Sequence, residues 1–526
     1  MKKRIGYFLS AVSLGIFLFG CNKDLNRLPT HGETADAVYS TMQGYQDAFA
    51  KLYGSIAMTG NNGPGSGDIQ GIDPGTSDFF RLYWNAQELS TDEAVVAWGD
   101  AGVQDFHNMN WGSSNPFLTG LYYRCMYQIT LDNEFIRQSS DEKISSRGIK
   151  GTDADQVKQF RAEARFLRAY QYWVLMDLYG NPPFITDADP IGTVPKQISR
   201  SDLFNYIEKE LNEIGPELAA PKSNQYGRVD QASVWALLAR MYLNAQVYTG
   251  QDRYTDAATN AAKVINAGYS LIPNYDWLFL ADNNLDTDEF LWTLNYDGLK
   301  SQGYGGTTFL THAAVGGSMV ATDYGVGGGW AGIRTTKNLP NLFPDYTGGL
   351  DHRSEFYTNG QNIDINAQSQ FTDGFAVTKF KNITRAGNAG SSLDFSDIDM
   401  PIFRLPEMYF IYAEAVLRGS STGDKTTALG YMNLLRERAY GGTQGDISAA
   451  DLTLQFILDE RARELYWEGY RRTDLIRYGL FTTGTYLWPW KGGVKSGTGV
   501  QDFRNLYPIP AKDLAANPNL VQNPGY

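Results

Sequence analysis

Aromatic side chains are the residues of this chain best suited to ligand chemistry. The 526 residues include 33 Tyr, 27 Phe and 11 Trp, and this 13% aromatic content exceeds what a core alone needs. A flat ring can cover the apolar C–H face of a sugar, while neighbouring polar groups bind its hydroxyl rim. The surplus therefore favours recognition of neutral, partly apolar ligands such as pyranose rings. Composition alone leaves open that these residues only fill the core and the loops.

Carboxylates are the candidate catalytic groups. Hydrolysis of a glycoside needs two of them about 5–10 Å apart. Asp92-Glu93 and Asp286–Glu289 offer acids, but adjacent acids point in different directions, and 58 Asp and Glu residues give many chance pairs. The 4 histidines are scattered without zinc-ligand spacing, and the sequence lacks phosphate-loop, nucleophile-elbow and dinucleotide motifs. We expect a binding protein and not an enzyme, with a hydrolase as the lesser alternative.

The net charge of the chain limits the classes of ligand that it can bind. A formal net charge of -13 argues against nucleic acid or a polyanionic ligand, because both require an excess of Lys and Arg. The run Asp282–Asp288 resembles the start of a calcium loop but lacks the glycine and the distant glutamate. We expect no cofactor and no metal ligands, and keep a structural calcium at this run as a lesser alternative. The charge-rich segment 460–468 should form a helix with inter-helix ion pairs and a solvated face.

The N-terminus carries an export signal. A basic start precedes an apolar run over residues 5–19, and Gly20 stands before Cys21. This order is typical of a bacterial lipoprotein signal. We expect residues 1–20 to be a signal peptide, Cys21 to carry a lipid that anchors the protein to a membrane, and residues 21–34 to form a tether. The alternatives are an ordinary cleaved signal and a spanning helix, which wants about 20 apolar residues. Cys125, the other cysteine, is expected to be a buried structural thiol.

Hydrophobic periodicity predicts a mainly α-helical chain. The expected helices span 36–53, 121–138, 156–180, 199–215, 231–249, a segment from Tyr254, 404–418 and 426–439. Trp235, Leu238, Ala239 and Tyr242 have the spacing of a tetratricopeptide helix, for which the segment from Tyr254 would be the partner. A small residue at Ala239 lets two such helices approach closely.

Two segments with little helical pattern are the expected ligand-binding regions. Residues 274–400 are rich in Gly, Tyr, Thr and Asn, and residues 60–112 begin with a glycine-rich stretch. Glycine runs such as 303–306 and 325–329 interrupt any regular element. Irregular regions of this size in a compact protein are usually functional.

Several motifs together resemble one known family. The stretch 161–170, RAEARFLRAY, leads into 177–184, DLYGNPPF, and both are similar to the signature helix of the SusD/RagB family of outer-membrane nutrient-binding lipoproteins. Further matches are Gly227–Asp230, Arg404–Glu407, Ala413–Ala415, Asp459–Leu465, Glu468–Arg472, Asp474–Arg477, Tyr507–Pro510, Asn517–Leu520 and Gln522–Tyr526. The segments 85–93, 371–375 and 486–493 look like the starch-binding branch of that family.

The resemblance implies a fold, a location and a partner. The fold would be an α-helical bundle of about four tetratricopeptide-like pairs over residues 35–526, with the ligand site in its irregular part. The protein would lie on the cell surface, at the outer membrane, and pass oligosaccharide to a SusC-like TonB-dependent transporter. The implied cargo is a starch-like α-glucan, and another glycan or a peptide is the alternative.

The resemblance also implies site residues. An arc of three aromatic rings would be formed by Trp98, Tyr304 and Trp330, with polar contacts from Asp73, Arg81 and Asp100. Asp100 follows Trp98 where the starch-binding branch places an asparagine nearby, so an amide contact is lost or replaced. From the residues alone, a tryptophan such as Trp98 after an apolar pair belongs to the core more often than to a ligand site, and Arg81 could be a structural ion-pair residue.

Overall fold

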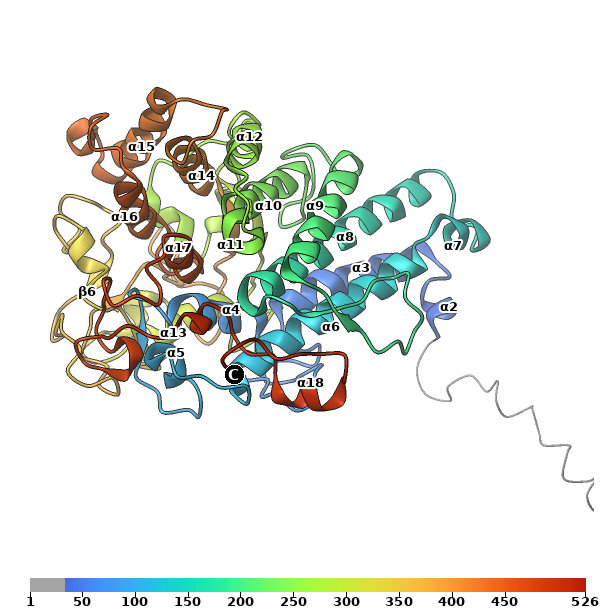
Figure 1. The fold of residues 1–526 in the computed structure, drawn as a ribbon, viewed down its shortest axis with the longest axis horizontal. Helices are drawn as coiled ribbons and strands as arrows, with labels where there is room; N and C mark the ends of the chain where they lie inside the picture. The colour runs from blue at the N-terminus through green and yellow to red at the C-terminus, as the bar shows by residue number, and fades with distance from the viewer. Residues whose placement is uncertain (1–33) are drawn as a thin grey trace, which may run out of the picture.

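The computed structural model describes residues 34–526, so the predicted signal peptide and lipidated Cys21 lie outside the described residues (Figure 1). The helices are α2 Ala35–Val38, α3 Met42–Ala57, α4 Phe79–Glu88, α5 Gln104–Asn108, α6 Pro116–Gln138, α7 Asp141–Ser146, α8 Thr152–Tyr179, α9 Arg200–Ile214, α10 Gln231–Leu243, α11 Ala245–Thr249, α12 Tyr254–Ile265, α13 Gly306–Ala313, α14 Leu405–Leu417, α15 Lys425–Tyr440, α16 Leu454–Leu465, α17 Arg471–Arg477 and α18 Ala511–Ala516. The strands are β1 Val95–Val96, β2 Pro183–Phe184, β3 Lys196–Gln197, β4 Phe290–Leu294, β5 Ile333–Arg334, β6 Phe356–Tyr357, β7 Ala376–Val377 and β8 Met400–Arg404. Within residues 34–526, none of these helices has the length and apolar character needed to cross a membrane.

Paired helices build the scaffold, as the sequence predicts. α6 packs on α8, α8 on α9, α10 on α12, and α14 on both α12 and α15. Ala239 is fully buried on α10, in keeping with a close approach to α12. Figure 1 shows α3, α6, α8 and α9 on one side and α12, α14, α15 and α16 on the other, with the irregular segments below the latter group. The predicted mainly α-helical, tetratricopeptide-like fold is confirmed.

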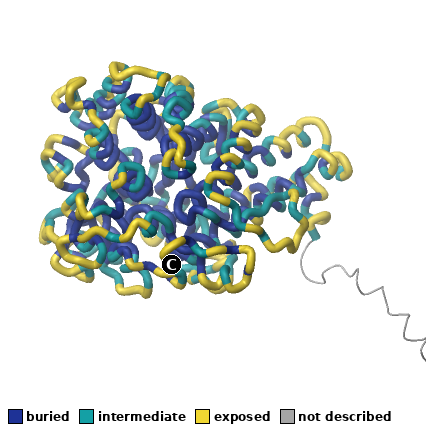
Figure 2. The backbone as a smooth tube through the Cα atoms, viewed as in Figure 1, coloured by how far each residue is buried: buried dark blue, intermediate teal, exposed yellow. Residues whose placement is uncertain are grey.

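One hydrophobic core runs through the described residues, from Tyr39 to Leu520 (Figure 2). Helix α8 ends at Tyr179 and is followed by the cap residue Gly180, whose φ of 75° is positive. A Cβ atom at this position would lie 2.9 Å from Leu506 Cδ1. Glycine therefore satisfies both the turn and the close packing of the C-terminal segment against the helix end.

The predicted helix over 231–249 is broken at Asn244, between α10 and α11. The side chain of Asn244 donates to the carbonyl oxygen of Arg240 at 2.9 Å and accepts from Arg477 Nη1 at 2.9 Å. Asparagine side chains compete with the helical hydrogen bonds in this way. The tertiary contact with Arg477, 233 positions away, favours the break over a continuous helix.

The segment 60–112 is less irregular than the sequence indicates, because it contains α4. Every residue of α4 is buried, so its sequence shows no polar face from which a helix could be recognised. The Asp78 side chain caps the helix by accepting from Arg81 N at 3.0 Å. The segment 274–400 is mostly irregular, but it holds α13 and β4, and β4 pairs antiparallel with β8.

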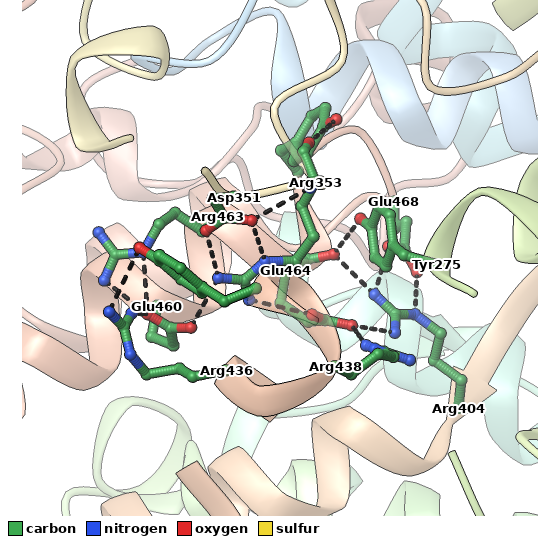
Figure 3. A network of polar contacts seen from close by, with 12 residues as sticks. Tyr275, Asp351, Arg353, Arg404, Arg436, Arg438, Glu460, Arg463, Glu464 and Glu468 are labelled. Carbon is green, nitrogen blue, oxygen red and sulfur yellow. Dashed lines mark hydrogen bonds and ion pairs between the residues drawn. The ribbon is translucent and has the colours of Figure 1, made fainter. Parts of the chain in front are cut away.

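The charged residues of α16 lie inside the protein, so the predicted solvated face is wrong. Glu460 and Glu464 are fully buried and pair with arginines from other segments (Figure 3). Glu464 alone contacts the guanidinium groups of Arg353, Arg404 and Arg438. The predicted inter-helix ion pairs are confirmed. Because these ion pairs are buried, the network holds α15, α16 and the strand β8 together.

Candidate ligand-binding site

The three predicted aromatic residues lie together. The ring centroids of Trp98 and Trp330 are 6.4 Å apart, and those of Trp330 and Tyr304 are 6.5 Å apart, so Trp330 is the middle ring. Neighbouring ring planes are inclined by 47° and 56°. Tyr304 is 40% exposed, and both tryptophans are partly buried. The three rings are thus tilted to one another and do not form a flat strip; we call these three residues the aromatic arc.

A short sheet brings the two tryptophans together. Val96 of β1 stands opposite Ile333 of β5, and the pairing continues with a hydrogen bond of 2.7 Å from Ala97 N to Gly332 O. The antiparallel register therefore places Trp98, the next residue, beside the chain segment that carries Trp330. The resemblance alone gives no such reason for their proximity.

Glycines on both sides of Trp330 permit this arrangement. A Cβ atom at Gly332 would lie 2.2 Å from Trp98 Cζ2, and one at Gly329 would lie 2.1 Å from Val315 O. Real Cβ atoms do not approach other atoms so closely, so larger residues would displace the indole of Trp98 or the loop. The glycine-rich sequence around Trp330 thus reflects close packing of the site.

His312, which sequence reasoning did not identify, supports the middle ring. Its imidazole stacks on the Trp330 indole, with centroids 4.8 Å apart and an inclination of 23°. A 2.8 Å hydrogen bond between His312 Nδ1 and Gly328 O fixes the orientation of the imidazole. Burial lowers the pKa of this imidazole. Because His312 covers one face of Trp330, a ligand must use the opposite face. In the sequence, only the position of His312 shortly after Tyr304, near the end of α13, could have pointed to this role.

Arg81 lies beneath the aromatic arc. Its Nη1 donates to the carbonyl oxygens of Gly75 at 2.9 Å and Tyr304 at 3.0 Å, and its guanidinium lies 4.7 Å from the ring centroid of Phe309. Burial lowers the pKa of Arg81 to about 10, still well above neutral, so the group stays charged. Arg81 bonds to carbonyls and not to a carboxylate, so it positions Tyr304 through its main chain. A direct contact of Arg81 with ligand stays a prediction.

Asp73 and Asp100 line one cavity of about 330 Å³. The carboxylate of Asp73 accepts from Gly75 N at 2.9 Å and from Thr76 Oγ1 at 3.2 Å, which fixes the turn that Arg81 also binds. Both aspartates are exposed. Both carboxylates lie close enough to Arg81 to act on its charge, but none of the three arc residues lines this cavity. A contact of Asp73 and Asp100 with ligand stays a prediction.

Four of the carboxylates considered for catalysis are buried, and the fifth, Asp288, is exposed and pairs with Lys222. Asp92 is 1% and Glu93 2% exposed, and Asp92 makes hydrogen bonds of 2.8 and 2.7 Å with Arg471. Asp286 and Glu289 are also buried and pair with arginines. These acids therefore stabilise the fold and do not form an open pair around a sugar bond.

The run Asp282–Asp288, considered as the start of a calcium loop, contacts the side chain of Arg385. Arg385 Nη2 lies 2.5 Å from Asp286 Oδ2, and Arg385 N donates to Asp282 Oδ1 at 3.1 Å. No group of three potential metal-ligating side chains is found among residues 34–526. Asp286 is thus already paired with Arg385, and a structural calcium at this run stays an untested alternative.

Comparisons with known proteins agree on one family. A model described as the SusD family matches residues 352–526, and one described as starch-binding associating with outer membrane matches residues 85–243. The chain is 35% identical to the starch-binding protein SusD of Bacteroides thetaiotaomicron, covering 100% of this chain and 99% of that protein. It is 27% identical to the SusD-like protein P2 of Formosa agariphila, with 100% of both chains covered.

Solved structures show the same fold. Surface glycan-binding protein A from Bacteroides thetaiotaomicron, solved in complex with laminarihexaose, superposes with a TM-score of 0.70 at 22% identity, covering 91% of this chain and 99% of that chain. A SusD superfamily protein from the same species gives a TM-score of 0.68 at 21% identity, covering 92% and 100%.

Proposed function

This chain belongs to the SusD family, and from that premise we propose that it captures starch-like α-glucan oligosaccharides at the cell surface and passes them to a SusC-like TonB-dependent transporter. The lipid on Cys21 would hold it at the outer membrane. The 35% identity to a starch-binding protein supports the choice of starch over other cargoes.

The observation that carries this proposal is the spacing and tilt of the three rings in the aromatic arc. Each ring is inclined by about 50° to its neighbour, at a centroid spacing close to 6.5 Å. A coiled α-glucan turns its successive sugar faces in a comparable manner, whereas a straight cellulose-like chain presents flat faces. The arc therefore suits the apolar faces of consecutive units in a curved glucan.

The expected affinity is modest. Stacking at about 1–1.5 kcal/mol per ring supplies roughly 3–4.5 kcal/mol from the arc. A few hydrogen bonds to charged groups, at about 1.5–3 kcal/mol each, offset desolvation and the lost freedom of the ligand. The net dissociation constant should lie between about 10 µM and 1 mM. Such weak binding allows the rapid release that transfer to a transporter requires.

Calorimetric titration of the chain from residue 22 onward tests the cargo. We expect heat of binding with maltohexaose, weaker binding with laminarihexaose and none with cellohexaose. Because a fold relative was solved with laminarihexaose, tighter binding of that sugar would redirect the proposal to another curved glucan. No heat with any of the three sugars would contradict the glycan assignment and leave another cargo, such as peptide.

Cell fractionation tests the location. The Cys21→Ser variant should move from the membrane fraction to the soluble fraction, because it cannot accept a lipid. A variant that stays on the membrane would contradict the anchor. Recovery of a TonB-dependent transporter with the tagged wild-type protein from detergent-treated outer membranes tests the partnership.

A further inference from the structure

A fourth aromatic ring continues the aromatic arc. The ring centroid of Phe395 lies 5.8 Å from that of Tyr304, with the planes inclined by 48°. Along the series Trp98, Trp330, Tyr304 and Phe395 the spacings are 6.4, 6.5 and 5.8 Å, and the inclinations are 47°, 56° and 48°. The fourth ring thus repeats the spacing and tilt of the other three.

The segment that carries Phe395 is held firmly. Within this segment, residues 391–397, Asp397 Oδ1 accepts from Gly298 N and from Ser391 Oγ, both at 2.7 Å. Asn382 Nδ2 donates to Ser392 O at 2.8 Å. These bonds fix a loop that would otherwise need to be ordered by the ligand, which lowers the entropic cost of stacking on Phe395.

The same segment is joined to the loop that carries Trp330. Gly327 N donates to Leu393 O at 2.8 Å, and Asn382 Nδ2 also donates to Gly325 O at 3.1 Å. Phe395 itself is only partly buried, and Tyr304 beside it is 40% exposed. The two rings therefore stand at a shared surface and on one rigid support.

We propose that Phe395 is the fourth ring of the binding surface and stacks on the sugar unit that follows the one on Tyr304. This inference rests on the proposed function, and it adds a preference for chain length. A three-unit glucan can cover three rings at most, whereas a chain of four or more units gains the contact with Phe395. Affinity should therefore rise from maltotriose to maltotetraose and depend on this residue.

Calorimetric titration of the full mature chain with maltotriose and maltoheptaose tests the inference. Phe395→Ala should weaken maltoheptaose binding about fivefold to tenfold, the effect of one stacking contact. Maltotriose binding should change less than about twofold, because three rings remain. Phe395→Tyr keeps a flat face and should retain affinity, whereas Phe395→Leu keeps apolar bulk without the face and should lose it.

Tyr346→Ala is the matched control. Tyr346 is also 40% exposed, but its ring packs on Phe375 at 5.4 Å and belongs to no contact of the arc. It should leave both affinities unchanged. An equal loss in the control, an unchanged maltoheptaose affinity in Phe395→Ala, or Leu and Tyr variants that behave alike would overturn the inference while the proposed function stands. A wild-type protein that binds neither sugar would overturn both.

Discussion

The indole nitrogen of Trp98 donates a hydrogen bond of 3.0 Å to the main-chain oxygen of Trp330, although the residues lie 232 positions apart. One ring of the aromatic arc thus holds the backbone of the next. The sheet between β1 and β5 and the stacking of His312 add to this support. The aromatic arc is formed by the protein before any ligand arrives, which lowers the cost of binding.

Trp330→Ala should weaken maltohexaose binding more than tenfold. Trp330 is the middle ring, so its loss removes one stacking face and separates the other two rings, and each factor of ten corresponds to about 1.4 kcal/mol. Calorimetric titration gives the dissociation constant, and thermal unfolding reports whether the fold is kept. An unchanged constant would remove Trp330 from the site.

Trp235→Ala is the control for that variant. Trp235 is a partly buried tryptophan on α10, where Lys263 lies 6.0 Å from its ring centroid. Its removal should leave the dissociation constant unchanged while lowering stability. Equal losses of affinity in both tryptophan variants would point to a general loss of structure.

Arg81→Lys should weaken maltohexaose binding about threefold to tenfold. A lysine lacks the planar guanidinium that lies 5.5 Å from the ring centroid of Trp98 and 4.7 Å from that of Phe309. Without this ring contact, the donor that Nη1 now directs at Gly75 O and Tyr304 O would be less well placed, so Tyr304 would lose main-chain support. The measurement is a titration well below the melting temperature of the variant. If the affinity stays at the wild-type value, Tyr304 does not depend on Arg81.

The sequence was informative where one face of an element differs from the other. Helix α8 could be identified because exposed and buried residues mix in its first half, up to residue 165, although residues 166–179 are all buried. Helix α4 has no exposed side, so no periodicity distinguishes it from irregular chain. The solvated face predicted for α16 was wrong for a related reason. A row of Glu and Arg reads as a solvated face unless the arginines of distant segments are known to meet it.

The sequence named three candidate rings that lie together in the structure, but it did not predict their geometry. Trp330 after three glycines is difficult to bury in a core, and this marked it as a ligand-binding candidate. The tilt between the rings depends on the register of β1 and β5, a pairing of two-residue strands that no pattern reveals. No sequence pattern reveals His312 and Phe395 either, because their contacts with Trp330 and Tyr304 form only in the folded chain.

Glu464→Gln should lower the free energy of unfolding by about 3–5 kcal/mol, because it removes a buried negative charge that compensates three buried guanidinium groups, those of Arg353, Arg404 and Arg438. Burial alone would raise the pKa of Glu464, but the arginines around it hold this pKa well below its usual range. The carboxylate therefore stays charged at neutral pH. Its contribution begins to decrease below the ordinary glutamate pKa of 4.5 and is lost as the pH falls through the lowered pKa. Urea unfolding at pH 7 measures the difference.

Glu213→Gln is the matched control for Glu464→Gln. Glu213 also pairs with an arginine, Arg165, but its side chain is 47% exposed. A solvent-exposed pair contributes about 0–1 kcal/mol, so this variant should change stability by less than 1 kcal/mol. Equal effects of the two substitutions would show that burial does not set the strength of the network.

Glu93→Gln should reduce the loss of stability between pH 5 and pH 8. Burial raises the pKa of Glu88 to about 7, and burial together with the charge of Glu88 raises that of Glu93 well above its usual value. The folded protein thus keeps protons that the unfolded chain releases near pH 4.5, so this pair costs stability as the pH rises. A glutamine at position 93 removes one charge and can donate to Glu88, whose Oε2 is buried without a hydrogen bond. Stability should rise by about 1–2 kcal/mol at pH 8 and change little at pH 5. Urea midpoints that run parallel in both proteins across this range would exclude the pair as the source.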